Sequence, residues 1–284
     1  MIKFNSKHHS YEKESKTYTS VSQLIGRYKE PFKSDHYSYY KAYELFFGKK
    51  EFASLRKTSG FHHSDPKLIE WLKMIVSEKE IAPYVETILK EWESKKDAAI
   101  KKGNDYHSFK ENQTLKEGVC LNPYTNKECT TVPSSIIKSE KGVELRESSV
   151  QSLIELKDGF HPECLLWNDE VGIAGQADKV FIETIKGVRY VDIDDYKTNK
   201  KIDTINPFKT KMKDPLSHLD CCNYNHYRLQ ISAYAWLLEK AGYTIRYLGF
   251  THLNKPYRFD YLKKEIDSIM PTNNLLLTLK QVDF

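Results

Sequence analysis

The clearest alternation of hydrophobic and polar positions lies in the segment YVDIDDYKT, residues 190–198. β-Branched and aromatic residues crowd this segment, which predicts a β-strand. Because successive side chains of a strand alternate between its faces, one face would carry Val191, Ile193, Asp195 and Lys197. This face begins apolar, as a core-facing row does. It ends in an acid and a base, although a buried charge is costly unless it is compensated.

A second strand is predicted just upstream, in GIAGQADKVFIE, and the intervening TIKGVR offers Gly187 for a turn with positive φ. A turn centred between Lys186 and Gly187 would make the following pairs across the hairpin: Ile182 with Val191, Val180 with Ile193, and Asp178 with Asp195. The apolar residues match, which supports this register. It also places two carboxylates opposite one another, with Cβ atoms about 4.5–5.5 Å apart.

Two carboxylates so close repel each other unless one takes up a proton or a cation lies between them. Magnesium is commonly held by one or two carboxylates, waters and a substrate phosphate. Lys197 projects on the same side as Asp195 and could orient a metal-bound water or offset charge on a phosphate. The alternative is a structural ion pair between Lys197 and either Asp195 or Asp178. Asp194 belongs to the opposite face and is not expected to be a ligand.

Hydrophobic periodicity predicts the other elements. In the C-terminal half we expect strands at 160–168, 174–183, 189–197 and 243–253, and a helix at 224–241 that Gly242 ends. The order strand, strand, strand, helix, strand predicts an α/β sheet with helices packed on it. Residues 66–102 are expected to be helical up to an interruption at Gly103, after which DYHSFKENQTLKEG continues as another helix. Residues 118–142 are expected to form a long loop or an irregular hairpin.

Composition sets wider bounds. The chain has 284 residues, 39% hydrophobic and 29% charged, enough for one large domain or two modest ones. We expect a mostly helical N-terminal region over 1–100 and a core over 101–284. The sequence holds no apolar stretch typical of a membrane span or a leader, so an intracellular, cytoplasmic protein without membrane contact is expected. The five cysteines form no CxxC pair and are expected to be free thiols, while the net charge of +5 weakly favours an anionic partner.

The segments GIAGQADKV, VDIDDYKTNKK and LQISAYAWLLE together resemble the PD-(D/E)xK nucleases, and most of all their RecB-type and lambda-exonuclease-type branch. That branch joins a G-x-x-D strand, a D-x-K strand and a Q-x-x-x-Y helix, which match Gly175 to Asp178, Asp195 to Lys197, and Gln230 to Tyr234. A leading G-x-x-x-H matches Gly103 to His107, and Glu163 matches a glutamate common on the preceding strand. The resemblance covers about residues 100–253. Each motif is short, but four in the same order make a specific joint signal.

The resemblance implies a restriction-endonuclease-like core, with a mixed central sheet flanked by helices. Asp178 and Asp195 would bind Mg²⁺ or Mn²⁺, together with His107 and the backbone carbonyl of Tyr196. Lys197 would position or activate the attacking water. The implied catalytic set is Asp178, Asp195, Lys197 and Glu163, and Gln230 and Tyr234 would contact DNA near the scissile phosphate. The close-set cysteine trio of iron–sulfur members is missing, so no cluster is expected.

Several residues keep a second interpretation. His161 competes with His107 as the metal ligand. Lys200 and Lys201 begin a lysine-rich loop after the D-x-K strand, which is either a solvated surface or a set of phosphate contacts. Arg228 is a further candidate for DNA contact.

Two other groups are equally open. Gln230 and Tyr234 share one helical face and are either substrate-facing or a pair at the edge of the core. The aromatic patch within HYSYYKAYELFF is either a satellite of the core or a surface on which unpaired bases stack.

The expected function is therefore that of a metal-dependent deoxyribonuclease acting on DNA. By analogy with the family branch, an exonuclease is favoured over a sequence-specific endonuclease. Proteins of DNA replication, recombination or repair are candidate partners, and the oligomeric state is left open. The rivals are a non-catalytic DNA-binding or assembly module that retains the fold, and another metal hydrolase or a plain structural α/β domain. The joint presence of Asp178, Asp195 and Lys197 argues against a dead site.

Overall fold

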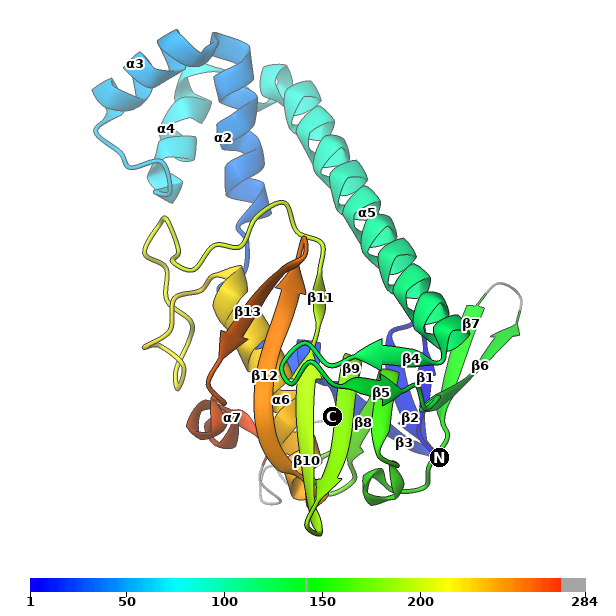
Figure 1. The fold of residues 1–284 in the computed structure, drawn as a ribbon. Coiled ribbons are helices and arrows are strands. Elements are labelled where there is room, and N and C mark those ends of the chain that lie inside the picture. The colour runs from blue at the N-terminus through cyan, green and yellow to red at the C-terminus, as the bar shows by residue number, and fades with distance from the viewer. Residues whose placement is uncertain (141–142, 272–284) are drawn as a thin grey trace. The chain divides into compact units, whose positions relative to one another are not determined.

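The computed structural model describes residues 1–140 and 143–271. The chain is mixed α/β and divides into two compact units (Figure 1). One unit comprises residues 1–30 and the chain from Gly103 onwards, and it contains the large sheet. The other comprises residues 31–102 and is helical.

The large sheet is mixed and has eleven strands. Its centre is an antiparallel meander of β8 (Gly159–Asn168), β9 (Ile173–Ile185) and β10 (Val188–Asp194). The remaining strands of this part are β11 (Tyr196–Lys197), β12 (Thr244–His252) and β13 (Lys255–Phe259). β12 runs parallel to both β10 and β11 and antiparallel to β13.

The hairpin between β9 and β10 has the predicted register. Ile182 pairs with Val191 and Val180 with Ile193. The two-residue turn has φ of 49° at Lys186 and 80° at Gly187, the pair of positive angles that a tight hairpin turn of this kind needs. The apolar residues of this face are fully buried, so the hydrophobic match and the turn together determine which side chains face the core.

Helix α6 (Asn223–Lys240) connects β10 and β11 to β12 and covers one face of the sheet. Its apolar residues, including Leu229, Ala233 and Leu237, join one core with the hairpin residues. Figure 1 shows α6 behind β10 and β12, and the small hairpin of β4 (Val119–Leu121) and β5 (Glu128–Thr130) in front of the sheet. The sheet is therefore covered on both faces in this region.

The predicted elements of the C-terminal half are confirmed, with ends that agree within two residues. The exception is the strand expected at 189–197, which the structure divides into β10 and β11 at Asp195. Gly242 has φ of 94° and follows the end of α6, as expected. Two short helices complete this part, a 3₁₀ turn at Leu153–Glu155 and α7 at Lys263–Ile269. Residues 118–142 contain the β4–β5 hairpin and then strand β6 (Ser135–Glu140).

The first thirty residues differ from the expected helical region over 1–100. They form β1 (Lys3–Asn5), β2 (Ser10–Lys13), β3 (Lys16–Ser20) and the short α1 (Val21–Gly26). β3 pairs with β9 and β1 with β7 (Val143–Ser148), so these strands extend the large sheet. They bury one aromatic residue each, Phe4, Tyr11 and Tyr18. Because the strands are short and otherwise polar, no long alternation marks them in the sequence.

The helical unit contains α2 (Ser34–Phe47), α3 (Lys49–Ser59), α4 (Pro66–Ile75) and the first part of α5 (Glu78–Glu117). Its core includes Tyr43, Phe52 and Leu72, with Tyr39, Tyr40 and Phe47 packed partly against it. The aromatic patch of α2 thus supplies core residues, which agrees with its interpretation as a satellite of the core. One member, Phe46, is 37% exposed.

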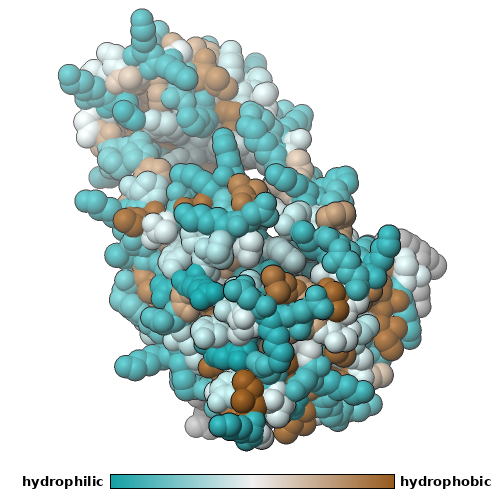
Figure 2. Space-filling view, viewed as in Figure 1, coloured by the Kyte–Doolittle hydropathy of each residue, from teal (hydrophilic) through white to brown (hydrophobic). Residues whose placement is uncertain are grey.

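The expected interruption at Gly103 is wrong, because α5 continues through it to Glu117. One glycine within a helix costs only about 1 kcal/mol relative to alanine, and good helix formers, Lys101 and Lys102, precede this one. The true break lies earlier, at Val76, whose extended backbone ends α4. Across the described residues, no helix combines the length and the apolar character needed to cross a bilayer. Figure 2 shows a largely hydrophilic face with separated hydrophobic groups.

Gly175 of β9 lies against the ring of Tyr234 on α6. A Cβ at Gly175 would come within 2.5 Å of Cε1 of Tyr234 and 3.1 Å of Cγ2 of Val21. Tyr234 is only 3% exposed, so its ring has little room to move. The absence of a side chain at this position thus allows α6 to pack closely on β9.

We therefore expect Gly175→Ala to destabilise the protein by about 1–3 kcal/mol, the usual cost of overpacking a core. Gly26→Ala is the matched control, because a Cβ there meets no atom within 4 Å. Urea unfolding of the two variants and the native chain measures the difference. Equal stability of Gly175→Ala and the native protein would contradict the close packing.

Candidate active site

Three side chains from separate elements lie close together on one side of the sheet, where β10 ends. Nδ1 of His107 on α5 lies 3.2 Å from Oδ1 of Asp178 on β9 and 3.4 Å from Oε1 of Glu163 on β8. One ligand atom from each residue lies within 4.8 Å of the others. Glu163 and Asp178 are 7% and 8% exposed, while the His107 side chain is 30% exposed. An imidazole and two carboxylates suit a divalent cation, and the histidine side is open to solvent.

The strand register brings Glu163 to Asp178. Pro162 pairs with Lys179, and Cys164 pairs with Ala177. Glu163 therefore lies opposite Asp178 in β8. Its φ is 47°, a conformation that residues with a side chain rarely adopt and that is often found at functional sites. Gln176 donates a hydrogen bond from Nε2 to the Glu163 carboxylate, which holds its second oxygen.

Asp195 occupies the break between β10 and β11, beside Asp178. Its backbone carbonyl accepts a hydrogen bond from the Thr251 N–H at 2.8 Å. The N–H of the next residue, Tyr196, donates to Oδ2 of Asp178 at 2.7 Å. Burial and then the charge of Asp178 raise the pKa of the Asp195 carboxyl to about 7. The predicted juxtaposition of these two acids is thus present in the structure, with the electrostatic conflict that was expected from it.

Two cations partly relieve this conflict. Burial alone would lower the pKa of His107, but the charges and hydrogen bonds of Asp178 and Glu163 outweigh it and raise the pKa to about 11. Burial likewise opposes the charge on Lys197, yet Asp195 and Asp178 raise its pKa. A cluster of three buried acids therefore favours positive charge strongly enough to keep both bases protonated. A divalent cation would satisfy the same field.

Lys197 is held in place by contacts from three sides. Nζ donates to Oδ2 of Asp195 at 2.9 Å and to Oε1 of Gln230 at 3.3 Å, and it lies 4.5 Å from the ring centroid of Tyr227. Gln230 in turn donates from Nε2 to the Tyr234 hydroxyl at 2.9 Å. A structural ion pair between Lys197 and Asp195 is thus present, and it lies within the acidic cluster. An ion pair placed there does not rule out that Lys197 also orients a water or a phosphate.

Tyr234 differs from its expected role as a DNA contact. Its ring is buried beneath Gln230 and Gly175, where a polynucleotide does not reach it. Its hydroxyl instead fixes the amide of Gln230, which is partly exposed. The structure thus makes Tyr234 a supporting residue and leaves Gln230 as the member of the pair within reach of a substrate.

The opposite face of β10 carries different contacts, as the alternation predicts. Asp194 pairs with Lys179 and accepts hydrogen bonds from Tyr124 and Thr251 at 3.1 and 3.0 Å. Asp192 pairs with Arg246 at 2.6 Å and accepts from Asn122 at 2.7 Å. Tyr124 and Asn122 belong to the β4–β5 hairpin segment, so these two acids anchor that segment to the sheet. Neither contributes to the candidate metal cluster.

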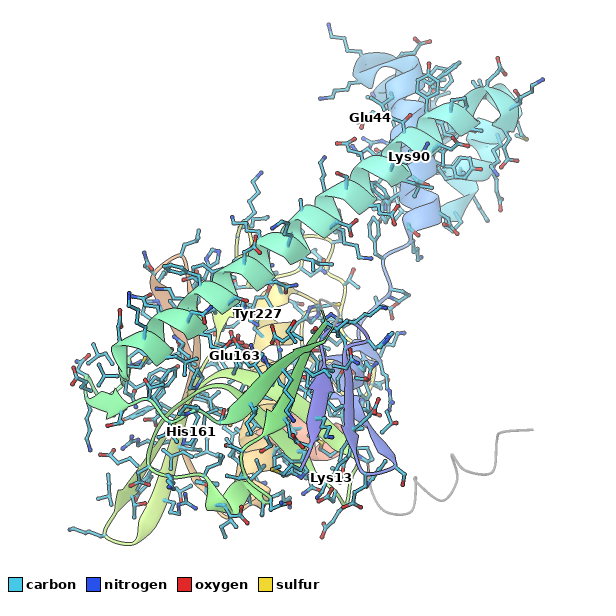
Figure 3. The ribbon with its side chains drawn as sticks, turned by 90° about the vertical axis from the view of Figure 1, so that its right-hand side faces the viewer. Lys13, Glu44, Lys90, His161, Glu163 and Tyr227 are labelled. Carbon is cyan, nitrogen blue, oxygen red and sulfur yellow. The ribbon has the colours of Figure 1, made fainter. Side chains whose placement is uncertain are left out.

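Of the two histidines considered as metal ligands, only His107 lies beside the acids. His161 is buried, and its Nε2 lies 2.7 Å from the carbonyl oxygen of Lys157. Burial lowers its pKa, and it does not belong to the acidic cluster. In Figure 3, Glu163 lies next to the ribbon of α5 whereas His161 lies further from it. His107 is therefore the histidine that the structure brings to the acids.

The candidate DNA contacts are only partly brought together. Lys200 and Lys201 are exposed on the loop after β11, and Lys201 pairs with Asp203 at 2.7 Å. Arg228 is directed elsewhere: its guanidinium lies 5.5 and 5.8 Å from the rings of Tyr224 and Phe259. Two residues along a helix correspond to a rotation of about 200°, so Arg228 and Gln230 occupy different sides of α6. The expectation that Arg228 joins the site is not met.

Three residues near the site were missed from the sequence. Gln176 orients Glu163, and the Tyr227 ring covers Lys197. Lys29, just after α1, is half-buried: burial lowers its pKa, Cys221 opposes this effect, and the positive charge of Lys197 adds to it. Gln176 lies within the G-x-x-D segment, and Tyr227 lies three residues, or nearly one helical turn, before Gln230. Only Lys29 depends on a distant part of the chain.

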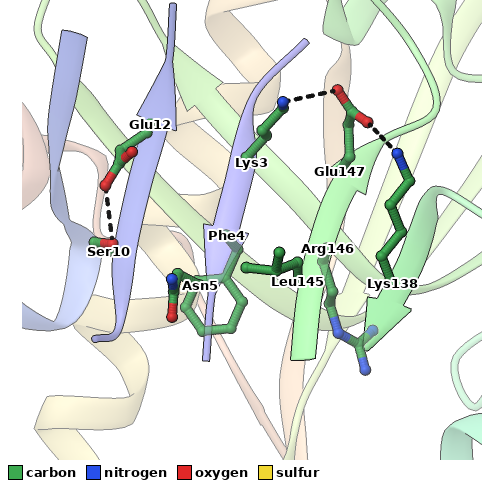
Figure 4. Close-up of a pocket in the computed structure, with 9 residues that line it drawn as sticks. All are labelled: Lys3, Phe4, Asn5, Ser10, Glu12, Lys138, Leu145, Arg146 and Glu147. Carbon is green, nitrogen blue, oxygen red and sulfur yellow. Dashed lines mark hydrogen bonds and ion pairs between the residues drawn. The ribbon is translucent and has the colours of Figure 1, made fainter. Parts of the chain in front are cut away.

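A separate cavity of ≈ 200 Å³ lies among β1, β2, β6 and β7 (Figure 4). Two acids line it: Glu147 lies between Lys3 at 3.8 Å and Lys138 at 3.7 Å, and Glu12 accepts a hydrogen bond from Ser10. Phe4 and Leu145 line another part of it. Both acids have partners and no histidine or cysteine is present among the lining residues, so we assign no chemistry to this cavity.

No family model matches the chain, and no curated protein shows significant sequence similarity to it. Its function is therefore inferred from its side chains and their geometry.

We expect the acidic cluster to bind Mn²⁺, and Asp178→Asn to weaken that binding at least about tenfold, since one charged ligand is lost. Asp203→Asn is the matched control, because Asp203 pairs with Lys201 outside the cluster. Calorimetric titration with Mn²⁺ compares the two variants. Equal loss in both, or no binding to the native chain, would contradict the assignment.

Acidification should weaken this binding. A bound cation must displace the proton of His107 and, below about pH 7, also that of Asp195. Each displaced proton changes the affinity by up to about tenfold per pH unit, so the loss should steepen below about pH 7. Repeating the Mn²⁺ titration across that range tests the effect, and a pH-independent affinity would show that neither proton is released.

Proposed function

We propose that this protein is a metal-dependent deoxyribonuclease with a restriction-endonuclease-like core, and that it acts as an exonuclease. The observation that carries the proposal is the acidic cluster with a lysine within it. Asp178 and Asp195 lie side by side, Lys197 is bonded to Asp195, and His107 and Glu163 close the cluster. A bound cation and a fixed positive donor each lower the barrier to phosphodiester hydrolysis, and this arrangement supplies the residues for both.

The residues suited to hold Mg²⁺ or Mn²⁺ are Asp178, Asp195, Glu163 and His107, and the resemblance adds the carbonyl of Tyr196. They fit such an ion because their donors are carboxylate oxygens and one imidazole, and because the cluster is short of positive charge. When bound, a divalent cation would polarise a phosphoryl oxygen and lower the pKa of a water ligand.

Lys197 would act as a charged donor rather than as a base. Its pKa is raised by Asp195 and Asp178 despite its burial, so it keeps its proton at neutral pH. An ammonium held by Asp195 and Gln230 could orient the attacking water and offset the negative charge that grows on the phosphate. Tyr234 and Tyr227 would position this ammonium without touching the substrate.

DNA is proposed as the substrate for two reasons. Three lysines could contact phosphates: Lys29, which interacts electrostatically with Lys197, and Lys200 and Lys201, which are exposed on the loop after the D-x-K strand. The four motifs match the family branch that degrades DNA from its ends, and the preference for an exonuclease follows from that analogy.

The test compares end-labelled linear DNA with closed circular DNA, in Mg²⁺, Mn²⁺ or EDTA. We expect loss of the linear DNA only, dependent on the metal. Lys197→Ala should lower the cleavage rate by about 10²–10³-fold, the usual effect of removing one donor that stabilises a transition state. Lys211→Ala is the matched control, because Lys211 forms an exposed pair with Asp220.

Each contrary outcome has a distinct meaning. Salt-sensitive DNA binding without cleavage in any metal would identify a DNA-binding module that retains the fold. Cleavage of circular DNA would replace the exonuclease by an endonuclease. Full activity of Lys197→Ala would remove the role given to Lys197, and absence of both binding and cleavage would overturn the proposal.

A further inference from the structure

Two cysteines face each other in the β4–β5 hairpin and are not part of the His107, Glu163 and Asp178 cluster. Cys120 and Cys129 are direct partners in the antiparallel register, between the pairs Val119–Thr130 and Leu121–Glu128. Both thiols are free and partly exposed. Two thiols on directly opposed residues are a pair rather than two isolated cysteines, and small reagents can reach them.

The backbone hydrogen bonds identify the kind of pair. Asn122 N–H donates to the Lys127 carbonyl at 2.8 Å, and Thr131 N–H donates to the Gly118 carbonyl at 2.8 Å. Cys120 and Cys129 lie midway between these two bonded pairs, so they occupy a hydrogen-bonded position. Such partners have Cα atoms about 5.5 Å apart, within the range of about 4.4–6.8 Å seen in disulfides.

The Cβ atoms are less favourably placed. Opposed residues have Cβ atoms about 4.5–5.5 Å apart, and hydrogen-bonded pairs such as this one lie at the longer end, whereas a disulfide prefers about 3.5–4.5 Å. The two strands would have to move closer together at this position to form the bond. A disulfide made in this way is strained and therefore easier to reduce than a structural one.

We propose that Cys120 and Cys129 are a redox-active pair that forms a reversible disulfide with small-molecule disulfides such as oxidised glutathione. This proposal does not depend on nuclease activity. The thiolate of Cys129 attacks one sulfur of glutathione disulfide and releases one glutathione. The thiolate of Cys120 then attacks the mixed disulfide and releases the second. The two protein thiols are oxidised, and one glutathione disulfide is reduced to two glutathione molecules.

The surroundings determine the order and the pace of these steps. Burial raises the pKa of Cys120 to about 11. Lys179 opposes the effect of burial at Cys120, and Lys127 opposes it at Cys129, whose pKa is also raised by burial. Cys129 is the less buried of the two thiols. Cys129 is thus the better first nucleophile, and the reaction should be slow at neutral pH and faster in alkali.

The crosslink would fasten a segment that already binds the sheet. Asn122 and Tyr124 of this hairpin hold Asp192 and Asp194, the acids that precede Asp195 on β10. Figure 1 shows the hairpin lying across β9 and β10. Oxidation would therefore link β4 to β5, the two strands of the hairpin that is anchored to this face of the sheet.

The test incubates the folded protein with oxidised glutathione at about pH 9, above the ordinary thiol pKa of about 8.5, for long enough to allow for the raised pKa values, and then alkylates it under denaturing conditions. The reduced chain takes five labels, one for each cysteine. The oxidised chain should take three, a peptide map should show Cys120 joined to Cys129, and reduced glutathione should restore all five. Cys120→Ser should abolish the crosslink and leave glutathione on Cys129. Cys221→Ser, which removes another partly exposed thiol, should keep it.

Three results would overturn the proposal. The first is five labels after oxidation of the native chain. The second is a crosslink that persists in Cys120→Ser and so joins other cysteines. The third is a Cys120–Cys129 bond that forms only after the chain is unfolded in urea, because the folded hairpin would then not bring the thiols together.

Discussion

The repulsion between Asp178 and Asp195 is the constraint on which the site depends. The hairpin packs its apolar residues at Val180, Ile182, Val191 and Ile193 into the core, and the same register then forces two acids together at its end. Neither acid can move to the other face without turning the apolar residues out of the core. Hydrophobic burial therefore holds the two acids in an electrostatically unfavourable position. The positive charges of Lys197, His107 and any bound cation reduce their repulsion.

The two faces of β10 divide structural and chemical roles. On one face, Asp192 and Asp194 are matched by Arg246 and Lys179 and hold the small hairpin in place. On the other face, acids outnumber the cations near them. Both sets are buried, so burial alone does not separate them. The difference is that each acid of the first set has its own base, whereas Asp178, Glu163 and Asp195 share two.

Local patterns predicted much of this arrangement, and tertiary contacts determined the rest. The hairpin register, the face of Asp194 and the limits of α6 follow from alternation, turn chemistry and helical periodicity, which act over a few residues. The strands of the first twenty residues were missed because each buries a single aromatic side chain. The burial of Tyr234 depends on how α6 lies against β9, and the direction of Arg228 on which side of that helix meets β13. Such facts are set by packing between distant segments and leave no local trace.

The close approach of Gly175 to Tyr234 changes how the G-x-x-D and Q-x-x-x-Y signatures should be understood. They lie far apart in the sequence, yet the missing side chain of Gly175 makes space for the ring of Tyr234, which braces the amide beside the ammonium of Lys197. The two segments therefore form one support, because a side chain at position 175 would displace the Tyr234 ring and, through it, the Gln230 amide that Lys197 contacts.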